Sequence, residues 1–316
     1  MHTVLVFVGF LIGLVLLIKG ADIFVDAGVG ISRRLHISPV LVAITLVSMG
    51  TSLPELVISV TAAFQGANDL AVANVVGANS FNLVMILGLA AIVRPFPVRF
   101  KEVKREYWLS VGAAVFLVAI ILFTPDDIIP RYASAILLVV YVAYIVYLIR
   151  TTPNTTDDDA PSDKKERKLT THILFSILAI ALIGVGGWIT VWSAESMGPI
   201  LGISERVVGL TIVAISTSLP ELTITLLACK RGENEMAVGT IVGSNIFNIM
   251  AVLGVSGIIL PLAVSTGTKI DLAFLIAGSL LFFLFVTTRK RLSRVEGAVM
   301  VVLYIAYLIF LLVGVT

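Results

Sequence analysis

The chain has 316 residues, of which 58% are hydrophobic and 13% are charged, with a formal net charge of +2. Soluble domains carry about 25% charged residues, so this composition excludes a soluble globular protein and indicates an integral membrane protein in a lipid bilayer. The small net charge gives no indication of a nucleic-acid partner, and the single cysteine, Cys229, excludes an internal disulfide and a cysteine-built metal site.

Apolar runs of roughly 20 residues follow one another along the chain, and this length suits a helix that crosses a hydrocarbon core of about 30 Å. We expect ten such helices, at residues 3–30, 39–64, 70–93, 107–123, 133–149, 171–197, 207–228, 235–260, 272–287 and 296–315. The predicted fold class is therefore an all-α integral membrane protein with ten transmembrane helices.

The loops between these spans differ in their basic residues. Most of the 22 Lys and Arg residues fall in the loops after spans 1, 3, 5, 7 and 9, whereas the opposite loops hold only Arg131, Arg206 and Lys269. Because cytoplasmic loops are enriched in Lys and Arg, we expect the odd-numbered loops to face the cytoplasm. In a cell (plasma) membrane, both termini would then lie outside the cytoplasm.

Residues 151–170 interrupt the apolar pattern between spans 5 and 6. The segment is polar, contains two prolines and carries three consecutive acids, Asp157–Asp159. We expect a cytoplasmic linker at 151–170 between a first transmembrane repeat, 1–150, and a second one, 171–316. A regulatory cation site on the three acids is disfavoured because no folded loop is expected around them.

Two motifs occur twice, each time shifted by 166 residues. The heptapeptide MGTSLPE at 49–55 returns as ISTSLPE at 215–221, and GANSFN at 77–82 returns as GSNIFN at 243–248. Since each half has five spans, an odd number, the halves must enter the membrane in opposite senses, as two inverted five-helix repeats. In transporters of this construction the substrate site lies near the bilayer midplane, where broken helices of the two repeats meet.

Each heptapeptide carries a glutamate directly after a proline, in the middle of spans 2 and 7. An ionisable residue at mid-span costs about 2.5 to 3.5 kcal/mol on insertion scales, so Glu55 and Glu221 are candidate functional residues. The proline breaks the helix and frees a backbone oxygen four residues earlier. Only hard oxygen donors gather there, which favours an alkali or alkaline-earth cation over a transition metal. Their side chains belong to Thr51, Ser52, Glu55, Asn82, Thr217, Ser218, Glu221, Ser244 and Asn248.

Two glutamates at one low-dielectric site would repel each other without a cation, so protons should compete with cations there. The structural alternatives are ordinary proline kinks, Ser and Thr hydroxyls bonded to their own helix, and glutamates paired with a basic residue. The last is disfavoured because spans 2, 3, 7 and 8 contain no basic residue.

The two motifs, in both halves, resemble the alpha repeats of the sodium/calcium exchangers in the cation/calcium antiporter superfamily, in their compact prokaryotic form. The resemblance covers nearly the whole chain. It implies a secondary antiporter that exchanges several sodium ions for one calcium ion by alternating access, with spans 1 and 6 sliding as a gate. It implies neither enzymatic activity nor a bound cofactor, and its partners would be calcium, sodium and the bilayer, with no obligatory protein partner.

Carried over by position, the resemblance implies one central site and two flanking sodium sites. The central site would be formed by Glu55, Asn82, Glu221 and Asn248. The flanking sites would be formed by Thr51 and Ser52 with the carbonyl of Ser48, and by Thr217, Ser218 and Ser244 with the carbonyl of Ala214.

Three positions depart from the family pattern, and the mildest is Ser216, which replaces the first glycine of the motif and keeps its backbone carbonyl. Ala78 stands where the family usually has a serine, so the flanking site of the first half lacks one hydroxyl ligand. Asn248 replaces an acid found in potassium-dependent relatives, which disfavours potassium dependence. Calcium/proton exchange on the same scaffold remains the nearest alternative, although the two Thr-Ser pairs favour sodium. A cation channel and an intramembrane hydrolase are further alternatives, and the hydrolase lacks a base beside a serine.

Overall fold

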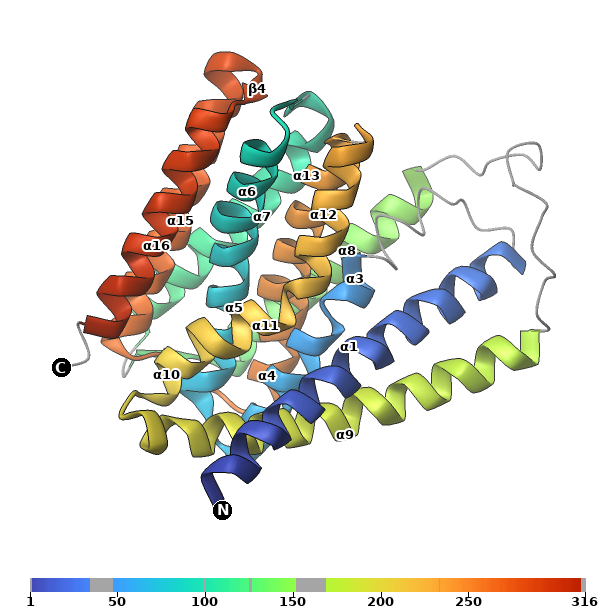
Figure 1. The fold of residues 1–316 in the computed structure, drawn as a ribbon, viewed down its shortest axis with the longest axis vertical. Coiled ribbons are helices and arrows are strands. Elements are labelled where there is room, and N and C mark those ends of the chain that lie inside the picture. The colour runs from blue at the N-terminus through green and yellow to red at the C-terminus, as the bar shows by residue number, and fades with distance from the viewer. Residues whose placement is uncertain are drawn as a thin grey trace.

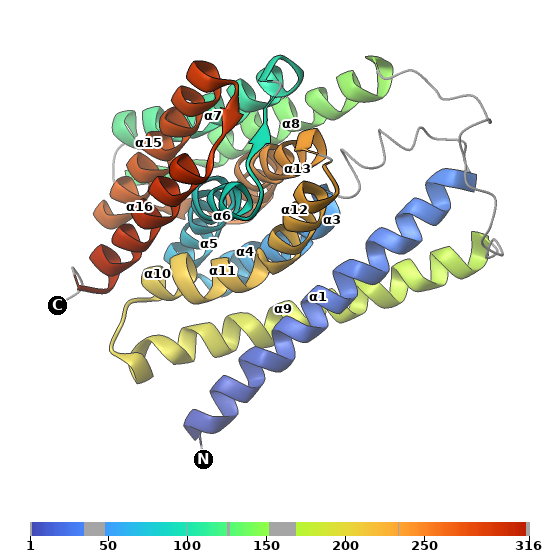
Figure 2. The same ribbon diagram turned by 45° about the horizontal axis from the view of Figure 1, so that its top comes forward.

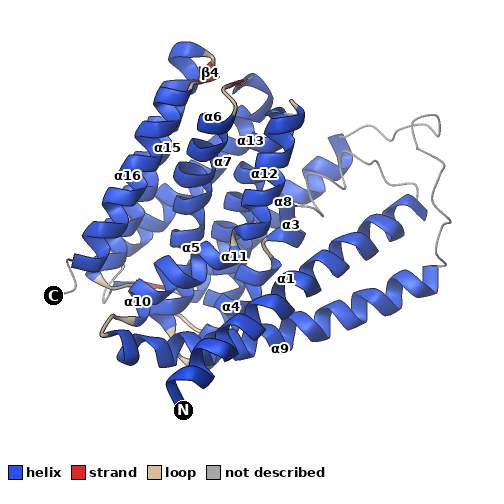
Figure 3. Ribbon diagram, viewed as in Figure 1, coloured by secondary structure: helices blue, strands red, loops and turns tan. Residues whose placement is uncertain are grey.

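The computed structural model describes residues 2–34, 48–98, 100–124, 127–151, 169–232 and 234–313. These residues are almost entirely helical, with two-residue strands in the connections (Figures 1 and 3). The first half contains α1 (His2–Arg34), α3 (Ser48–Thr51), α4 (Leu53–Gln65), α5 (Asn68–Ser80), η2 (Phe81–Ile86), α6 (Leu87–Val93), β1 (Phe96–Pro97), α7 (Phe100–Phe123), β2 (Ile128–Ile129) and α8 (Arg131–Thr151). The second half contains α9 (Leu169–Leu201), α10 (Glu205–Val208), η5 (Gly209–Val213), α11 (Ala214–Thr217), α12 (Leu219–Arg231), α13 (Asn234–Ile246), η6 (Phe247–Val252), α14 (Leu253–Ile259), β3 (Leu262–Ala263), α15 (Thr266–Arg289), β4 (Arg291–Leu292) and α16 (Arg294–Val313).

Within these residues, eight helices are long and apolar enough to cross a membrane. A ninth span results if Arg206–Thr217 and Leu219–Lys230, which meet at an angle of 43°, are one broken helix. Part of the predicted span at 39–64 lies outside the described residues, and α3 and α4 form its remainder. Nearly all of the predicted linker at 151–170, including Asp157–Asp159, lies outside them as well, so the count of ten spans stays a prediction.

Two spans form the centre of the bundle. The spans Asp69–Val93 (α5, η2 and α6) and Ala237–Ile259 (α13, η6 and α14) are each 83% buried, against 28% to 39% for the other six. Small and aliphatic residues predominate in these two helices and allow close packing in the interior of the bundle. The other spans surround them and expose apolar side chains, as expected of helices that face lipid.

The two halves repeat the same succession of elements. From α4 to α7, each element has a counterpart of equal length between α12 and α15, at a constant shift of 166 residues. The strands pair across the halves, because β1 is antiparallel to β4 and β2 is antiparallel to β3. The connections that follow the central spans therefore tie each half to the other.

Helices α1 and α9 lie side by side, oblique to the rest of the bundle, in both views of the molecule (Figures 1 and 2). Glycines allow this approach: a Cβ on Gly13 would lie 2.9 Å from the carbonyl oxygen of Gly186, and a Cβ on Gly186 would lie 2.8 Å from that of Gly13. With 33 residues each, these helices are about 50 Å long, so they must tilt or extend beyond a hydrocarbon core of about 30 Å. Helix α9 also packs on α4, next to one of the two helix breaks.

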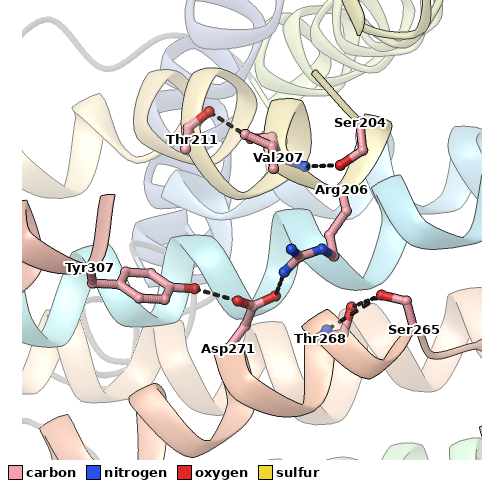
Figure 4. Close-up of polar contacts among 8 residues, drawn as sticks. All are labelled: Ser204, Arg206, Val207, Thr211, Ser265, Thr268, Asp271 and Tyr307. Atoms are coloured by element: carbon pink, nitrogen blue, oxygen red, sulfur yellow. Dashed lines mark hydrogen bonds and ion pairs between the residues drawn. The ribbon is translucent and has the colours of Figure 1, made fainter. Parts of the chain in front are cut away.

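A buried ion pair holds the start of the broken helix (Figure 4). Arg206 Nη1 of α10 lies 2.6 Å from Asp271 Oδ2 of α15, and the Tyr307 hydroxyl of α16 donates a hydrogen bond of 2.8 Å to Asp271 Oδ1. Asp271 is fully buried. A Cβ on Gly267 would collide with the Arg206 guanidinium, so the absence of a side chain there gives this group its space. Three helices are thus joined through one carboxylate.

Candidate cation-binding site

Each of the two heptapeptides breaks its helix at the serine before the Leu-Pro-Glu sequence. Ser52 separates α3 from α4 with φ −93° and ψ 10°, and Ser218 separates α11 from α12 with φ −85° and ψ 9°. The prolines that follow lie in the first turn of α4 and α12, where a helix has no donor to lose. The sequence therefore ends one helix and begins another at the same place in both halves.

Glu55 and Glu221 lie in the first turn after each break, so the positive end of a helix dipole favours their negative charge. Both side chains are fully buried. Among the ion pairs formed by described side chains, none includes either glutamate.

Each carboxylate accepts a hydrogen bond from a serine of the opposite half. Ser52 Oγ donates to Glu221 Oε1 at 2.9 Å, and Ser218 Oγ donates to Glu55 Oε1 at 3.2 Å. Ser244 Oγ adds a second donor to Glu221 Oε1 at 3.4 Å. Ser52 and Ser218 therefore bond to the glutamate of the opposite half, whereas Ser244 bonds to the glutamate of its own half.

Twelve buried side-chain polar atoms of the described residues have no hydrogen-bond partner, and four of these are Glu55 Oε2, Glu221 Oε2, Asn82 Oδ1 and Asn248 Oδ1. They come from elements in contact, since α4, which carries Glu55, touches η6, and α12, which carries Glu221, touches η2. Buried polar atoms nearly always have a partner, and an unpaired charged oxygen is especially costly. Carboxylate and amide oxygens are ligands of the kind that Ca²⁺ and Na⁺ accept.

The amide nitrogens of Asn82 and Asn248 each donate a hydrogen bond to another buried asparagine. Asn248 Nδ2 donates to Asn79 Oδ1 at 3.0 Å, and Asn82 Nδ2 donates to Asn245 Oδ1 at 3.4 Å. Asn79 and Asn245 are not among the residues that the sequence analysis assigned to the site. The sequence does contain a signal for these two residues, because the asparagine of the Gly-x-Asn motif occurs in both copies.

The predicted threonines make their hydrogen bonds within their own helices. Thr51 Oγ1 donates to the carbonyl of Ser48 at 3.1 Å, and Thr217 Oγ1 donates to those of Val213 at 3.1 Å and Ala214 at 3.3 Å. Both threonines also interact with the glutamate of the opposite half, Thr51 with Glu221 and Thr217 with Glu55.

The carbonyls of Ser48 and Ala214 also accept the backbone amides of Ser52, at 3.3 Å, and Ser218, at 3.2 Å. All of the predicted flanking groups are buried beside the helix breaks. Their carbonyl oxygens already have helical partners here, so a sodium ion would have to share or replace those bonds.

One position makes the site asymmetric. Ala78 is fully buried at the place equivalent to Ser244, one residue before the asparagine of its motif. Glu221 Oε1 accepts two serine hydroxyls, whereas Glu55 Oε1 accepts one. The expected loss of a hydroxyl in the first half therefore coincides with fewer donors on Glu55.

The chain is similar to proteins of one known family over most of its length. The family model described as sodium/calcium exchanger protein matches residues 5–150 and 171–313. CaxA of Alkalimonas amylolytica is 35% identical over 309 residues, covering 94% of this chain and 95% of that protein. The sodium/calcium exchanger MaX1 of Methanosarcina acetivorans is 30% identical over 342 residues, covering 95% and 97%.

A solved structure has the same fold. The sodium-calcium exchanger NCX_Mj, soaked with 10 mM Na⁺ and no Ca²⁺, superposes with a TM-score of 0.67 at 29% sequence identity. The match covers 96% of this chain and 98% of that one. The likeness therefore extends over both halves of the molecule.

Proposed function

Because the chain belongs to the sodium/calcium exchanger family, we propose that it is a secondary antiporter that exchanges sodium for calcium at a site built around Glu55 and Glu221. The observation that carries this proposal is the set of four buried, unpartnered oxygens on Glu55, Glu221, Asn82 and Asn248. A cation among them would give each oxygen a partner and would compensate the repulsion between the carboxylates.

Calcium suits the centre of this set. Ca²⁺ takes six to eight oxygen ligands and accepts carboxylates and amide carbonyls in flexible geometries. The two glutamates would balance its two positive charges, and the amide oxygens of Asn82 and Asn248 would add neutral ligands. Sodium is equally hard but has a single charge, so several sodium ions are needed to balance the same carboxylates.

Sodium ions would take the flanking positions. One site would use Thr51, Ser52 and the carbonyl of Ser48. The other would use Thr217, Ser218, Ser244 and the carbonyl of Ala214. A hydroxyl that donates its proton to a carbonyl or carboxylate keeps lone pairs for a cation. The hydrogen bonds of these residues in the described conformation are therefore compatible with sodium binding.

The exchanger would work by alternating access between two inverted five-helix repeats, at 1–150 and 171–316, joined by the linker 151–170. Elements of equal length at a constant shift and the pairing of strands across the halves support this division. Completing the broken second span would bring the total to ten helices. The glycine contact of α1 with α9, and of α9 with α4, supports a role of these two helices in covering the site.

The distribution of basic residues supports an orientation in the cell membrane with both termini outside the cytoplasm. In this orientation, Arg206 and Asp271 lie toward the outer surface, and the linker lies in the cytoplasm. Cysteine labelling with a membrane-impermeant reagent, at single cysteines placed in the linker and beside the N-terminus of a Cys229→Ala background, would test it.

Radioactive calcium uptake into proteoliposomes tests the function. Vesicles loaded with sodium and diluted into sodium-free medium at constant pH should accumulate calcium, whereas vesicles with only a pH gradient should not. Uptake that follows the proton gradient alone would overturn sodium coupling and indicate calcium/proton exchange. Uptake that requires neither gradient would contradict antiport altogether.

A further inference from the structure

The amide groups of Asn82 and Asn248 can present either of two chemically opposite ends to the site. The oxygen of an amide accepts hydrogen bonds and binds cations, whereas its nitrogen carries two donors and repels them. In both residues the nitrogen is engaged by another asparagine and the oxygen is left unpartnered. The orientation of these two ligands is thus decided by neighbours that lie outside the proposed donor set.

Those neighbours come from the opposite half in each case. Asn79 Oδ1 accepts the hydrogen bond from Asn248, while Asn79 Nδ2 donates to the backbone carbonyl of Asn245 at 3.1 Å. Asn245 Oδ1 accepts from Asn82, while Asn245 Nδ2 donates to the backbone carbonyl of Asn79 at 3.3 Å. The arrangement is reciprocal, and all four side chains are buried.

The backbone explains why an asparagine fits at these two positions. Asn79 and Asn245 lie two residues before the π-helical segments η2 and η6. A change from α- to π-type hydrogen bonding leaves a backbone carbonyl near the junction in need of a donor. Each asparagine donates to a backbone carbonyl of the other half close to such a junction, and its own amide oxygen accepts the bond from Asn248 or Asn82.

We propose that Asn79 and Asn245 are positioning residues that orient the amides of Asn248 and Asn82, so that oxygen rather than nitrogen faces the cation. This inference rests on the proposed function of the site. Neither residue would touch the ion. Each would act through one partner in the opposite half: Asn79 through Asn248, and Asn245 through Asn82.

A purely structural role would have a different signature. If Asn79 and Asn245 only clamp the two central helices together, their removal lowers stability and leaves calcium affinity unchanged. If they orient ligands, the loss of affinity depends on whether the ligand that they orient is still present. Double-mutant cycles measure this dependence, because coupled residues give effects that do not add.

The experiment measures the calcium KM and kcat of sodium-driven exchange for Asn79→Ala, Asn248→Ala and the double variant. We expect Asn79→Ala to raise the calcium KM by about tenfold, as for the loss of one oriented ligand, with a smaller change in kcat. The double variant should have the KM of Asn248→Ala alone. The pair Asn82→Ala and Asn245→Ala should behave in the same way.

Matched controls come from the same helices. The effects of Asn79→Ala and Asn82→Ala should multiply, because these residues lie in one half and act through different partners. Asn74→Ala provides a second control, since Asn74 is a buried asparagine of α5 that bonds to Ser59 and to the Glu55 backbone rather than to Asn248. In the double variant of Asn74→Ala with Asn248→Ala, the two changes in calcium KM should multiply.

Calcium-dependent stabilisation against heat provides a readout that needs no turnover. An unchanged calcium KM in Asn79→Ala, or independent effects in the pair with Asn248→Ala, would overturn the inference. If Asn79→Ala does not fold, the calcium KM values of Asn245→Ala, Asn82→Ala and their double variant test the inference by the same criteria. Failure of the proposed function is distinguishable, because the wild-type protein itself would then show no sodium-driven calcium exchange.

Discussion

Ser52 donates a hydrogen bond of 2.9 Å to Glu221, although 169 residues separate them in the chain. Ser218 and Glu55 form the equivalent bond at 3.2 Å. Each half therefore holds the carboxylate of the other half at the point where its own helix breaks. A cation that draws either carboxylate toward itself must act on both halves, which is a requirement for coupling ion binding to a change of access.

Replacing either glutamate by glutamine should abolish calcium exchange without unfolding the bundle. Glutamine has the same size but removes one of the two negative charges that balance Ca²⁺. Calcium uptake in proteoliposomes and thermal unfolding in detergent measure the two properties separately. Glu296→Gln is the matched control, because Glu296 is also buried but bonds to the backbone amide of Ser293 at the start of α16. Retained exchange in Glu55→Gln and Glu221→Gln would place the site elsewhere.

Ser218→Ala should destabilise the protein more than Ser52→Ala. Loss of Ser218 removes the serine donor of Glu55 Oε1, whereas Glu221 Oε1 keeps the bond from Ser244 after Ser52 is removed. Leaving a buried charged acceptor without a donor costs about 1 to 3 kcal/mol. Thermal unfolding in sodium-free, calcium-free buffer compares the two variants. Equal destabilisation would show that Ser244 does not substitute for Ser52.

Ala78→Ser should strengthen the dependence of exchange on sodium. The new hydroxyl would restore to the first half the ligand that Ser244 provides to the second. The measurement is the sodium activation curve of calcium efflux, for which we expect a lower half-activating concentration. Ala78→Val is the control that changes volume without adding an oxygen. A curve identical to that of the wild type would mean that the missing hydroxyl has no part in sodium binding.

Calcium transport should fall as the pH is lowered from neutral to mildly acid. A proton on either glutamate removes a negative charge that Ca²⁺ needs, and two carboxylates in one buried site repel each other less when one is protonated. Initial rates of calcium uptake at equal internal and external pH measure this competition, and raising calcium should relieve it. A flat profile would contradict the paired-carboxylate site.

Arg206→Met should be strongly destabilising. It leaves the carboxylate of Asp271, fully buried, without its cation, and breaking a buried pair in this way costs about 3 to 5 kcal/mol. The double variant Arg206→Met with Asp271→Leu should recover much of this loss. Lys269→Met is the control, since its pair with Asp127 is partly exposed to solvent and contributes at most about 1 kcal/mol. Chemical unfolding in detergent measures the stability of Arg206→Met, of the double variant and of Lys269→Met. Equal stability of the two single variants would refute the argument.

The sequence by itself determined the class of protein and the positions of the two glutamates. Apolar runs of about 20 residues predict membrane helices because the bilayer thickness dictates their length. The duplicated heptapeptides locate Glu55 and Glu221 beside helix breaks because proline cannot continue a helix at its interior. Both conclusions depend on the local chain alone, so neither requires knowledge of how the halves pack.

Only the tertiary structure decided which polar groups meet. The hydroxyls of Thr51 and Ser52 are neighbours in the sequence, yet the first bonds to its own helix and the second to Glu221. Asn79 reaches Asn248, which lies 169 residues away, and not its neighbour Asn82. A hydroxyl or amide can satisfy its hydrogen bonds locally or across an interface, and the choice depends on the partner that packing brings within reach.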